Sequence, residues 1–273
     1  MIKIYLKGGM GNQMFQYALG RVLSMKNKVP LVLDTSFYDL DLKPKREYDL
    51  DVFNLFSDLK IEKKLNIFKR FLFGMSGKVI KEKFFHFDSE IFKIGDNAIL
   101  EGYWQSPKYF EGYEDIIKKD FSFKKDFSLE IQNLAKEIKD KKSLCVHVRR
   151  GDFVGNTFHD VLDKDFYKKA FDILKEKVKI DKVYIFSDDI DWCRNNMNFP
   201  IPTVFVGNEY SGEKGEGNLF LMSLCKYFII PNSTFSWWGA WLSGSSMVVC
   251  PKKWFADESI NTNDLIPEKW IRI

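Results

Sequence analysis

The spacing of apolar residues predicts alternating strands and helices in the C-terminal half of the chain. Short apolar runs typical of buried strands lie at 144–148, 182–186, 202–206, 227–230 and 247–250. Stretches with helical spacing lie at 165–178, 217–225 and 234–242. Strands that alternate with helices predict βαβ units and a parallel sheet, whose strands are buried on both faces.

The N-terminal half begins with the same alternation and then becomes irregular. Its predicted elements are a strand at 2–6, a glycine-rich loop at 7–13, a helix at 14–28 and a strand at 30–33. The region from about 40 to 140 is rich in Lys and Phe, and only a helix at 129–139 can be predicted within it. We therefore expect an α/β domain over 1–140, a second over 141–250, and a tail over 251–273 that packs back on the body.

Composition narrows the class of protein. The 273 residues are 45% hydrophobic and 29% charged, which is typical of a globular protein. No apolar run approaches the ~18 residues of a membrane span, and the N-terminus lacks the features of a signal peptide. A net charge of +4 is too small to favour nucleic acid as a partner. The four cysteines show no metal-binding spacing, so we expect reduced thiols and a cytoplasmic location.

One local exception in charge is the segment 63–87, where Lys and Arg alternate with Phe. A basic aromatic surface of this kind can rest on anionic lipid, as a peripheral contact with the inner face of a membrane. A solvated amphipathic segment over a small core is the interpretation we favour, and the lipid alternative stays open.

Polar loops follow three of the predicted C-terminal strands. They are Arg149 to Asp152, Ser187 to Asp189, and Pro231 to Thr234. The carboxyl ends of parallel strands share one sheet edge, and ligands of doubly wound sheets bind beyond that edge. Arginine carries a planar fork of donors that suits phosphate oxygens. The loops therefore favour a phosphate ligand, and the alternative for the first loop is a surface Arg-Asp ion pair.

The other two loops allow more than one interpretation. Asn232 or Ser233 can cap the helix that follows, and a helix N-terminus can also hold a phosphate. The tryptophans of that helix indicate core packing more than a platform for sugar rings. For the acidic run 187–191 we rank recognition of a nucleotide base first, helix capping second and a divalent metal third.

The remaining candidates are the glycine loop and the histidines. The loop at 8–13 lacks the third glycine of a dinucleotide fingerprint, so NAD is disfavoured, but its glycines still allow a ligand to approach the backbone. His86 is interpreted as structural. His159 follows the arginine loop and is a candidate proton acceptor.

Four motifs taken together resemble the bacterial α-1,2-fucosyltransferases of glycosyltransferase family 11. They are GGMGNQMFQYA at 8–18, HVRRGD at 147–152, FSDD at 186–189 and NSTFSWWGAW at 232–241. The resemblance runs in order from residue 1 to about 250. It implies a GT-B-like α/β fold, in which two Rossmann-type domains have parallel sheets that face a central cleft.

The resemblance also implies the activity. Its donor is GDP-β-L-fucose, and L-fucose passes with inversion to the 2-hydroxyl of a galactoside in surface glycan biosynthesis, such as lipopolysaccharide or O-antigen. No cofactor and no divalent metal are expected. The alternatives are another nucleotide-sugar glycosyltransferase, including a metal-dependent one that uses Asp189 and Asp191, a non-enzymatic carbohydrate-binding protein, or the disfavoured NAD enzyme.

Individual roles follow residue by residue from the resemblance. Donor-binding positions are Gly11, Asn12, Gln13, His147, Arg149, Asp188, Ser233, Thr234 and Phe235. Arg149 is expected to grip the diphosphate, and His147 and Asp188 lie near the guanine. The candidate catalytic residues are Arg149, Asp152 and His159. The resemblance does not identify the general base; Asp152 and His159 are the candidates for it, and the alternative role of Asp152 is to orient the arginines.

Overall fold

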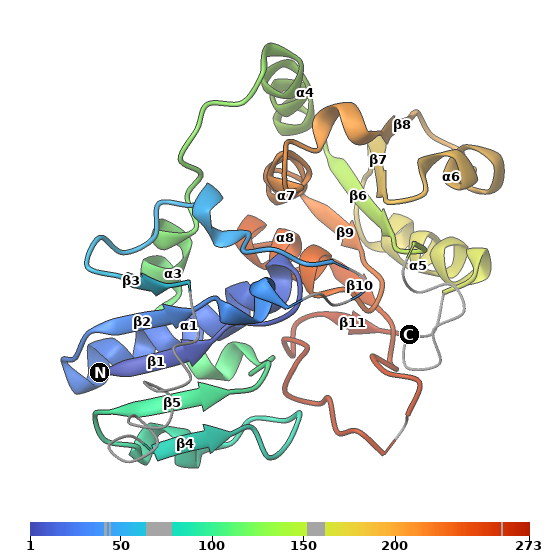
Figure 1. Ribbon diagram of the computed structural model, residues 1–273. Coiled ribbons are helices and arrows are strands. Elements are labelled where there is room, and N and C mark those ends of the chain that lie inside the picture. Colours follow the sequence, from blue (N-terminus) through green and yellow to red (C-terminus); the bar gives the residue numbers. More distant parts are fainter. Residues whose placement is uncertain (41–42, 44, 64–77, 152–161, 258) are drawn as a thin grey trace. The chain divides into compact units, whose positions relative to one another are not determined.

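The computed structural model divides the chain into two compact units, shown in Figure 1. It describes residues 1–40, 43, 45–63, 78–151, 162–257 and 259–273. Unit 1 comprises Met1–Lys124 and Asn261–Pro267, and unit 2 comprises Lys125–Ile260 and Glu268–Ile273. Each unit has its own parallel sheet.

Unit 1 is built on a five-stranded sheet in the order β3-β2-β1-β5-β4, with all neighbouring strands parallel. Its strands are β1 (Ile2–Tyr5), β2 (Leu31–Asp34), β3 (Lys60–Glu62), β4 (Lys78–Lys81) and β5 (Ala98–Glu101). Its helices are α1 (Met10–Asn27) and α3 (Glu114–Asp120), with short 3-10 turns at Ser36–Asp39, Leu50–Val52, Ser89–Lys93 and Pro107–Phe110.

Helix α1 packs closely on the unit 1 sheet because a glycine faces the strand beneath it. A Cβ atom at Gly20 would lie 2.5 Å from Cγ1 of Ile4 on β1. The helix ends at Asn27, and the C-cap residue Lys28 adopts the left-handed conformation with φ of 54°. The sequence predicted β1, α1 and β2. It did not predict β3, β4 or β5, which lie in the irregular Lys- and Phe-rich region.

Unit 2 has a six-stranded parallel sheet in the order β11-β10-β9-β6-β7-β8. Its strands are β6 (Ser143–Val148), β7 (Lys182–Ser187), β8 (Thr203–Val206), β9 (Tyr227–Ile229), β10 (Val248–Cys250) and β11 (Ile271–Arg272). Its helices are α4 (Leu129–Asp140), α5 (Lys164–Lys177), α6 (Ile190–Asn196), α7 (Glu216–Ser223) and α8 (Thr234–Ser243), with a 3-10 turn at Asn208–Tyr210. The predicted alternation of strands and helices is confirmed in this unit.

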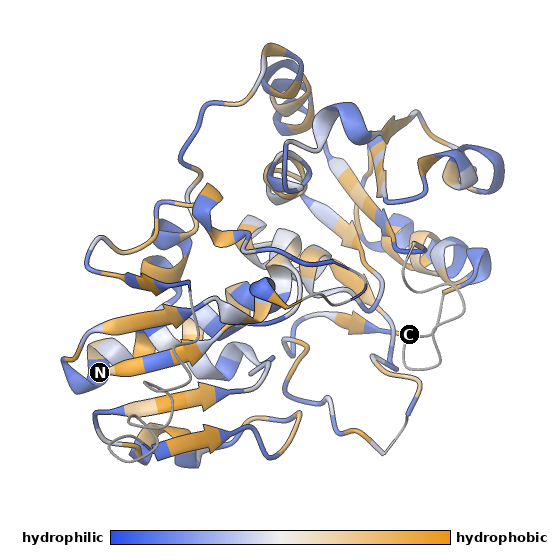
Figure 2. Ribbon diagram, viewed as in Figure 1, coloured by the Kyte–Doolittle hydropathy of each residue, from blue (hydrophilic) through white to orange (hydrophobic). Residues whose placement is uncertain are grey.

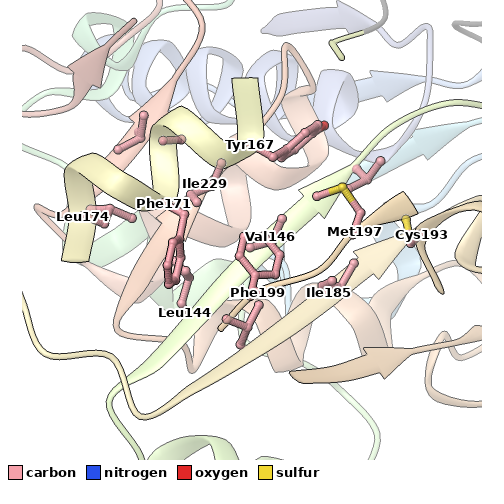
Figure 3. Close-up of a cluster of buried hydrophobic side chains, with 14 residues drawn as sticks. Leu144, Val146, Tyr167, Phe171, Leu174, Ile185, Cys193, Met197, Phe199 and Ile229 are labelled. Atoms are coloured by element: carbon pink, nitrogen blue, oxygen red, sulfur yellow. The ribbon is translucent and has the colours of Figure 1, made fainter. Parts of the chain in front are cut away.

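The core of unit 2 explains why its strands are continuous apolar runs. All six residues of β6 are buried, because β6 lies inside the sheet with covered faces. Figure 3 shows side chains of β6 and β7 packed with Tyr167, Phe171 and Leu174 of α5. Figure 2 shows the same division by hydropathy, with largely hydrophobic strands and hydrophilic residues on α4 and α5.

The tryptophans of α8 belong to the core. Trp237 and Trp238 have no exposed surface, and their ring centroids lie 5.1 Å apart in a T-shaped arrangement. Trp241 is stacked on Trp237 at 6.3 Å. The prediction of core packing is confirmed, and a sugar-binding platform made of Trp237 and Trp238 is ruled out by their burial.

The division into units differs from the sequence-based boundary at residue 140. Helix α4 belongs to unit 2, where Glu137 accepts hydrogen bonds from Lys182 Nζ at 2.6 Å and from the Tyr184 hydroxyl at 2.8 Å. The expected tail over 251–273 is also divided. Residues 261–267 join unit 1, where Ser106 Oγ donates to the Asp264 carbonyl at 2.8 Å. The end of the chain adds β11 beside β10.

None of the helices in the described part of the chain is long and apolar enough to cross a membrane. Most of the basic aromatic segment 63–87 lies outside the described residues. Within its described part, Phe84 is 49% exposed and its ring stacks on His86 with centroids 4.7 Å apart.

Candidate functional site

The strand order of the unit 2 sheet reverses between β6 and β9. Strands β7 and β8 lie on one side of β6, and β9, β10 and β11 lie on the other. Ligands of open α/β sheets bind beyond the carboxyl ends of the strands at such a switch point. The register pairs Val148 with Ser187 and Val146 with Ile229, so the three polar loops share one edge, as predicted.

Asp188 holds the arginine loop in place from the neighbouring strand end. Its Oδ1 accepts a hydrogen bond from the Arg150 backbone N–H at 2.9 Å, and its Oδ2 accepts one from the Gly151 N–H at 2.9 Å. The same Oδ2 lies 2.9 Å from Arg149 Nη1. A Cβ atom at Gly151 would lie 2.6 Å from that oxygen, so a larger residue there would displace the carboxylate. The carboxylate that we expected near the guanine is occupied by loop contacts.

The two adjacent arginines have different surroundings. Arg150 Nε donates to Asp189 Oδ2 at 3.2 Å, and its guanidinium lies 4.0 Å above the Trp192 ring. Asp189 Oδ1 also accepts from the Trp192 N–H and caps α6, which confirms the capping interpretation for this residue. Both oxygens of Asp189 therefore make protein contacts, and this weakens the metal alternative. The Arg149 side chain keeps 26% of its surface exposed.

His147 is the buried titratable group at this strand end. It is 5% exposed, and its Nδ1 has no hydrogen-bond partner in the part of the chain that the structure describes. Burial, together with the nearby positive charge of Arg149, lowers the pKa of His147 to about 3. Its ring centroid lies 6.2 Å from that of Phe235 on α8. The structure therefore brings His147 and Phe235 together and keeps the imidazole neutral near pH 7.

The N-terminus of α8 carries no side-chain cap. Ser233 occupies the N-cap position and is 8% exposed, but its hydroxyl makes no capping hydrogen bond, and the first turn has no acidic residue. The predicted capping by Ser233 is therefore wrong. Asn232 donates to the Trp254 carbonyl at 3.0 Å instead, and no described residue pairs with its buried Oδ1. An uncapped N-terminus with its partial positive charge suits an anionic group.

The predicted loop at 7–13 is shorter in the structure, because α1 begins at Met10 and contains Gly11, Asn12 and Gln13 in its first turn. We keep the name glycine loop for residues 8–13, whose side chains have different surroundings. The Gln13 side chain is fully buried. Its Nε2 donates to the carbonyls of Gly8 and Glu47 and to Asp49 Oδ2, and its Oε1 accepts from the backbone N–H of Asp49. Its expected contact with a donor is not supported by this geometry, because the whole amide is occupied. Asn12 is only half-buried, and its Oδ1 accepts from Gln105 Nε2 at 2.9 Å.

Two of the candidate catalytic residues, Asp152 and His159, lie outside the described residues.

Sequence reasoning also missed residues that the structure brings to the glycine loop. Gln105 follows β5, and Glu82 follows β4. The apolar run at 98–100, followed by Gly102, was the available signal for a strand with a functional loop.

An arginine loop and an open helix N-terminus at one switch point define a class of α/β proteins that bind phosphorylated ligands. The particular family follows from comparison with known proteins. Residues 1–273 match the model of glycosyl transferase family 11, and the chain belongs to this family. It is therefore a glycosyltransferase.

Individual relatives agree with this assignment. The chain is 33% identical over 283 residues to an Escherichia coli alpha-1,2-colitosyltransferase, covering 98% of this chain and 97% of that protein. It is 33% identical over 306 residues to the Escherichia coli O-antigen biosynthesis glycosyltransferase WbnK, covering 98% and 99%. A Bos taurus galactoside 2-alpha-L-fucosyltransferase, SEC1, is 29% identical over 164 residues, which are 56% of this chain and 44% of that protein.

Solved structures show the same fold. Fucosyltransferase NodZ from Bradyrhizobium superposes with a TM-score of 0.53 at 14% identity, covering 88% of this chain and 92% of that one. NodZ soaked with GDP-fucose gives a TM-score of 0.52 at 15% identity and the same coverage. The predicted GT-B-like α/β fold, with two parallel sheets, is confirmed.

Proposed function

We propose that this glycosyltransferase transfers L-fucose from GDP-β-L-fucose, with inversion, to the 2-hydroxyl of a galactoside acceptor. The observation that carries the proposal is Arg149, held by Asp188 at the switch point of the unit 2 sheet. The uncapped N-terminus of α8 follows the adjacent strand β9. Together they offer fixed positive charge for the diphosphate of a nucleotide sugar.

This arrangement suits the charge that develops during transfer. When the acceptor hydroxyl attacks the anomeric carbon, the bond to the β-phosphate breaks and negative charge grows on the departing GDP. Arg149 and the N–H groups of Thr234 and Phe235 would stabilise that charge without moving. Removing one such donor typically lowers the rate by about 10²–10³-fold.

The remaining donor contacts are part of the same proposal. His147, which stays neutral near pH 7, is assigned to the guanine side of the nucleotide. Its pKa of about 3 makes it a hydrogen-bonding group there and excludes it as a cation. From the glycine loop we retain Gly11 and Asn12, because the Gln13 side chain is already occupied. Asp188 is reassigned to holding Arg149.

The reaction also needs a base for the acceptor hydroxyl. Asp152 and His159 remain the two proposed proton acceptors, each of a residue type able to take a proton near neutral pH when suitably placed. The proposed reaction needs no divalent metal, since Arg149 and the helix N-terminus supply positive charge. The engagement of Asp189 by Arg150 and Trp192 supports this.

A second candidate donor is the GDP derivative of colitose. The observation that favours it is the 33% identity to an alpha-1,2-colitosyltransferase over nearly the whole chain. Colitose is fucose without its 3-hydroxyl, so one enzyme site must distinguish the two by contacts at that carbon. A site that hydrogen-bonds the 3-hydroxyl rejects the analogue that lacks it. Transfer rates from GDP-fucose and GDP-colitose therefore decide between the two donors.

The relatives also suggest the setting of the reaction. WbnK is named for O-antigen biosynthesis, and we propose a surface glycan or its lipid-linked precursor as the acceptor. We further propose a cytoplasmic enzyme, and for the basic aromatic segment 63–87 a peripheral contact with the inner membrane face stays the alternative to the favoured solvated segment. Binding to vesicles that contain anionic lipid, compared with neutral vesicles, tests that contact.

The test of the proposed function measures transfer to galactosides from GDP-fucose and, separately, from GDP-colitose. We expect wild-type transfer in excess EDTA, an α-1,2 linkage in the product and no transfer to 2-deoxygalactosides. Arg149→Ala should abolish detectable transfer in a folded protein. The matched control is Arg194→Ala, which removes an exposed arginine on α6. A strong preference for GDP-colitose would make GDP-colitose the donor in place of GDP-fucose. Full activity of Arg149→Ala would refute the assignment of Arg149 to the donor site.

A further inference from the structure

The strand order of the unit 1 sheet also reverses, between β1 and β5. Strands β2 and β3 lie on one side of β1, and β5 and β4 lie on the other. The glycine loop follows β1, and the segment from Gly102 to Gln105 follows β5. The two segments therefore meet at the position where sheets of this kind bind ligands.

The segment after β5 is held in an unusual backbone conformation. Glu82, just after β4, accepts hydrogen bonds from the backbone N–H groups of Tyr103 at 2.7 Å and Trp104 at 2.8 Å. Trp104 has a φ of 56°, in the left-handed region that non-glycine residues rarely adopt. A Cβ atom at Gly102 would lie 2.4 Å from Cβ of Glu82. These contacts direct the next residue, Gln105, toward the glycine loop.

Gln105 contacts Asn12 in a way that sets the orientation of the Asn12 amide. Gln105 is 6% exposed, and its Nε2 donates to Asn12 Oδ1 at 2.9 Å. The oxygen of Asn12 is therefore turned toward Gln105, and its Nδ2 is turned away. That nitrogen lies against Gly8, where a Cβ atom would approach it to 2.5 Å. Gly8 has a φ of 79°, so a side chain there would be strained as well.

The Gln105 side chain is unfavourable for folding in one respect, which indicates a role in binding rather than in stability. The Oε1 atom of Gln105 is buried and has no hydrogen-bond partner among the described residues. A buried unpaired amide oxygen is unfavourable for folding, and an apolar side chain of similar shape would avoid it. Gln105 makes one described side-chain hydrogen bond, and that bond is to Asn12.

We propose that Gln105 is a positioning residue that fixes the Asn12 amide so that its Nδ2 donates a hydrogen bond to the nucleotide-sugar donor. This inference rests on the proposed function, which retains Asn12 as a donor contact. Gln105 itself does not touch the donor; it acts through Asn12. Glu82 holds the backbone of Tyr103 and Trp104, and the next residue, Gln105, contacts Asn12, so three segments far apart in the sequence are joined.

A double-mutant cycle on the full-length chain tests whether Gln105 acts through Asn12. We expect Asn12→Ala to lower kcat with GDP-sugar by about 100-fold, as for loss of one donor to a developing charge. Gln105→Met should lower kcat about 10-fold, because an unrestrained amide spends only part of its time in the productive orientation. The double variant should match Asn12→Ala within about twofold, where independent effects would give about 1000-fold.

Two further measurements separate positioning from a structural role. The melting temperature of Gln105→Met should equal or exceed that of wild type, since the variant removes a buried unpaired oxygen. The acceptor KM should stay within about twofold. Gln132→Met, a change of an exposed glutamine on α4, is the matched control. Gln105→Leu gives a second variant with the same expected pattern, should the Met variant not fold.

The outcomes are distinct. An active wild type with additive effects in the cycle, or with full activity of Gln105→Met, overturns the role of Gln105 and leaves the proposed function in place. A wild type that transfers no sugar from either GDP-fucose or GDP-colitose overturns the proposed function, and this inference with it.

Discussion

The substitution Asp188→Asn tests whether the contacts of the Asp188 carboxylate hold the arginine loop in position. The Asp188 carboxylate accepts hydrogen bonds from two backbone N–H groups and pairs with Arg149 Nη1, and each of these three distances is 2.9 Å. Asparagine keeps the shape and one acceptor oxygen, but its NH₂ group faces one of the donors. One charge-assisted hydrogen bond is then lost, at about 1.5–3 kcal/mol. The ion pair adds up to about 1 kcal/mol, because both side chains are about a quarter exposed and screened.

The combined loss of about 1.5–4 kcal/mol should release the loop before it unfolds unit 2. We therefore expect kcat/KM for the GDP-sugar to fall by about 10²-fold, because Arg149 no longer has a fixed position. The melting temperature should fall by only a few degrees. Initial rates of transfer and thermal unfolding, measured on the same preparations, give the two values.

Asp191→Asn is the matched control, because Asp191 lies three residues further along and is exposed in the first turn of α6. Its transfer rate should stay close to that of wild type. If Asp188→Asn loses no more activity than Asp191→Asn, the carboxylate does not position Arg149, and the reasoning is refuted.

Two other predictions concern groups at the same sheet edge. The pKa of His147 is about 3 in the folded chain, and its ordinary value is 6.5. Between these pH values the unfolded chain binds more protons than the folded chain. The contribution of His147 to the free energy of unfolding therefore falls as the pH falls through this window. This contribution should drop by about 2 kcal/mol from pH 7.5 to 5. In denaturant unfolding, the free energy of unfolding of His147→Phe should therefore change less with pH than that of wild type. The same pH dependence in both proteins would contradict the prediction. Gly151→Ala should reduce transfer by displacing Asp188, whereas Gly95→Ala, with no atom within 4 Å of the new Cβ, should not; equal transfer by the two variants would refute the steric argument.

The parallel sheet of unit 2 could be predicted because its strands are buried on both faces. Burial on both faces produces apolar runs without alternation, and such runs are visible in the sequence. The same reasoning placed three polar loops at one sheet edge. Strands β3 and β4 could not be predicted, because they are sheet-edge strands with largely exposed side chains. Their sequences therefore carry no clear burial pattern.

The roles of single polar residues were harder to predict than the position of the site. Asp188 and Asp189 are adjacent and chemically identical, yet one holds the arginine loop and the other caps α6. Gln13 and Asn12 are also adjacent, yet Gln13 is buried in internal hydrogen bonds and Asn12 is half-exposed. These differences depend on partners that come from distant segments, and one sequence does not show which segments meet.

The sequence by itself determined the two α/β halves, the edge that carries Arg149, and the family. These properties depend on local patterns of burial and on contiguous motifs, which a chain displays without being folded. Only the tertiary structure decided which polar groups remain available for a ligand and which are already paired. The pairing of Gln105 with Asn12 across 93 positions is the clearest case, because β5 lies beside β1 only in the folded sheet.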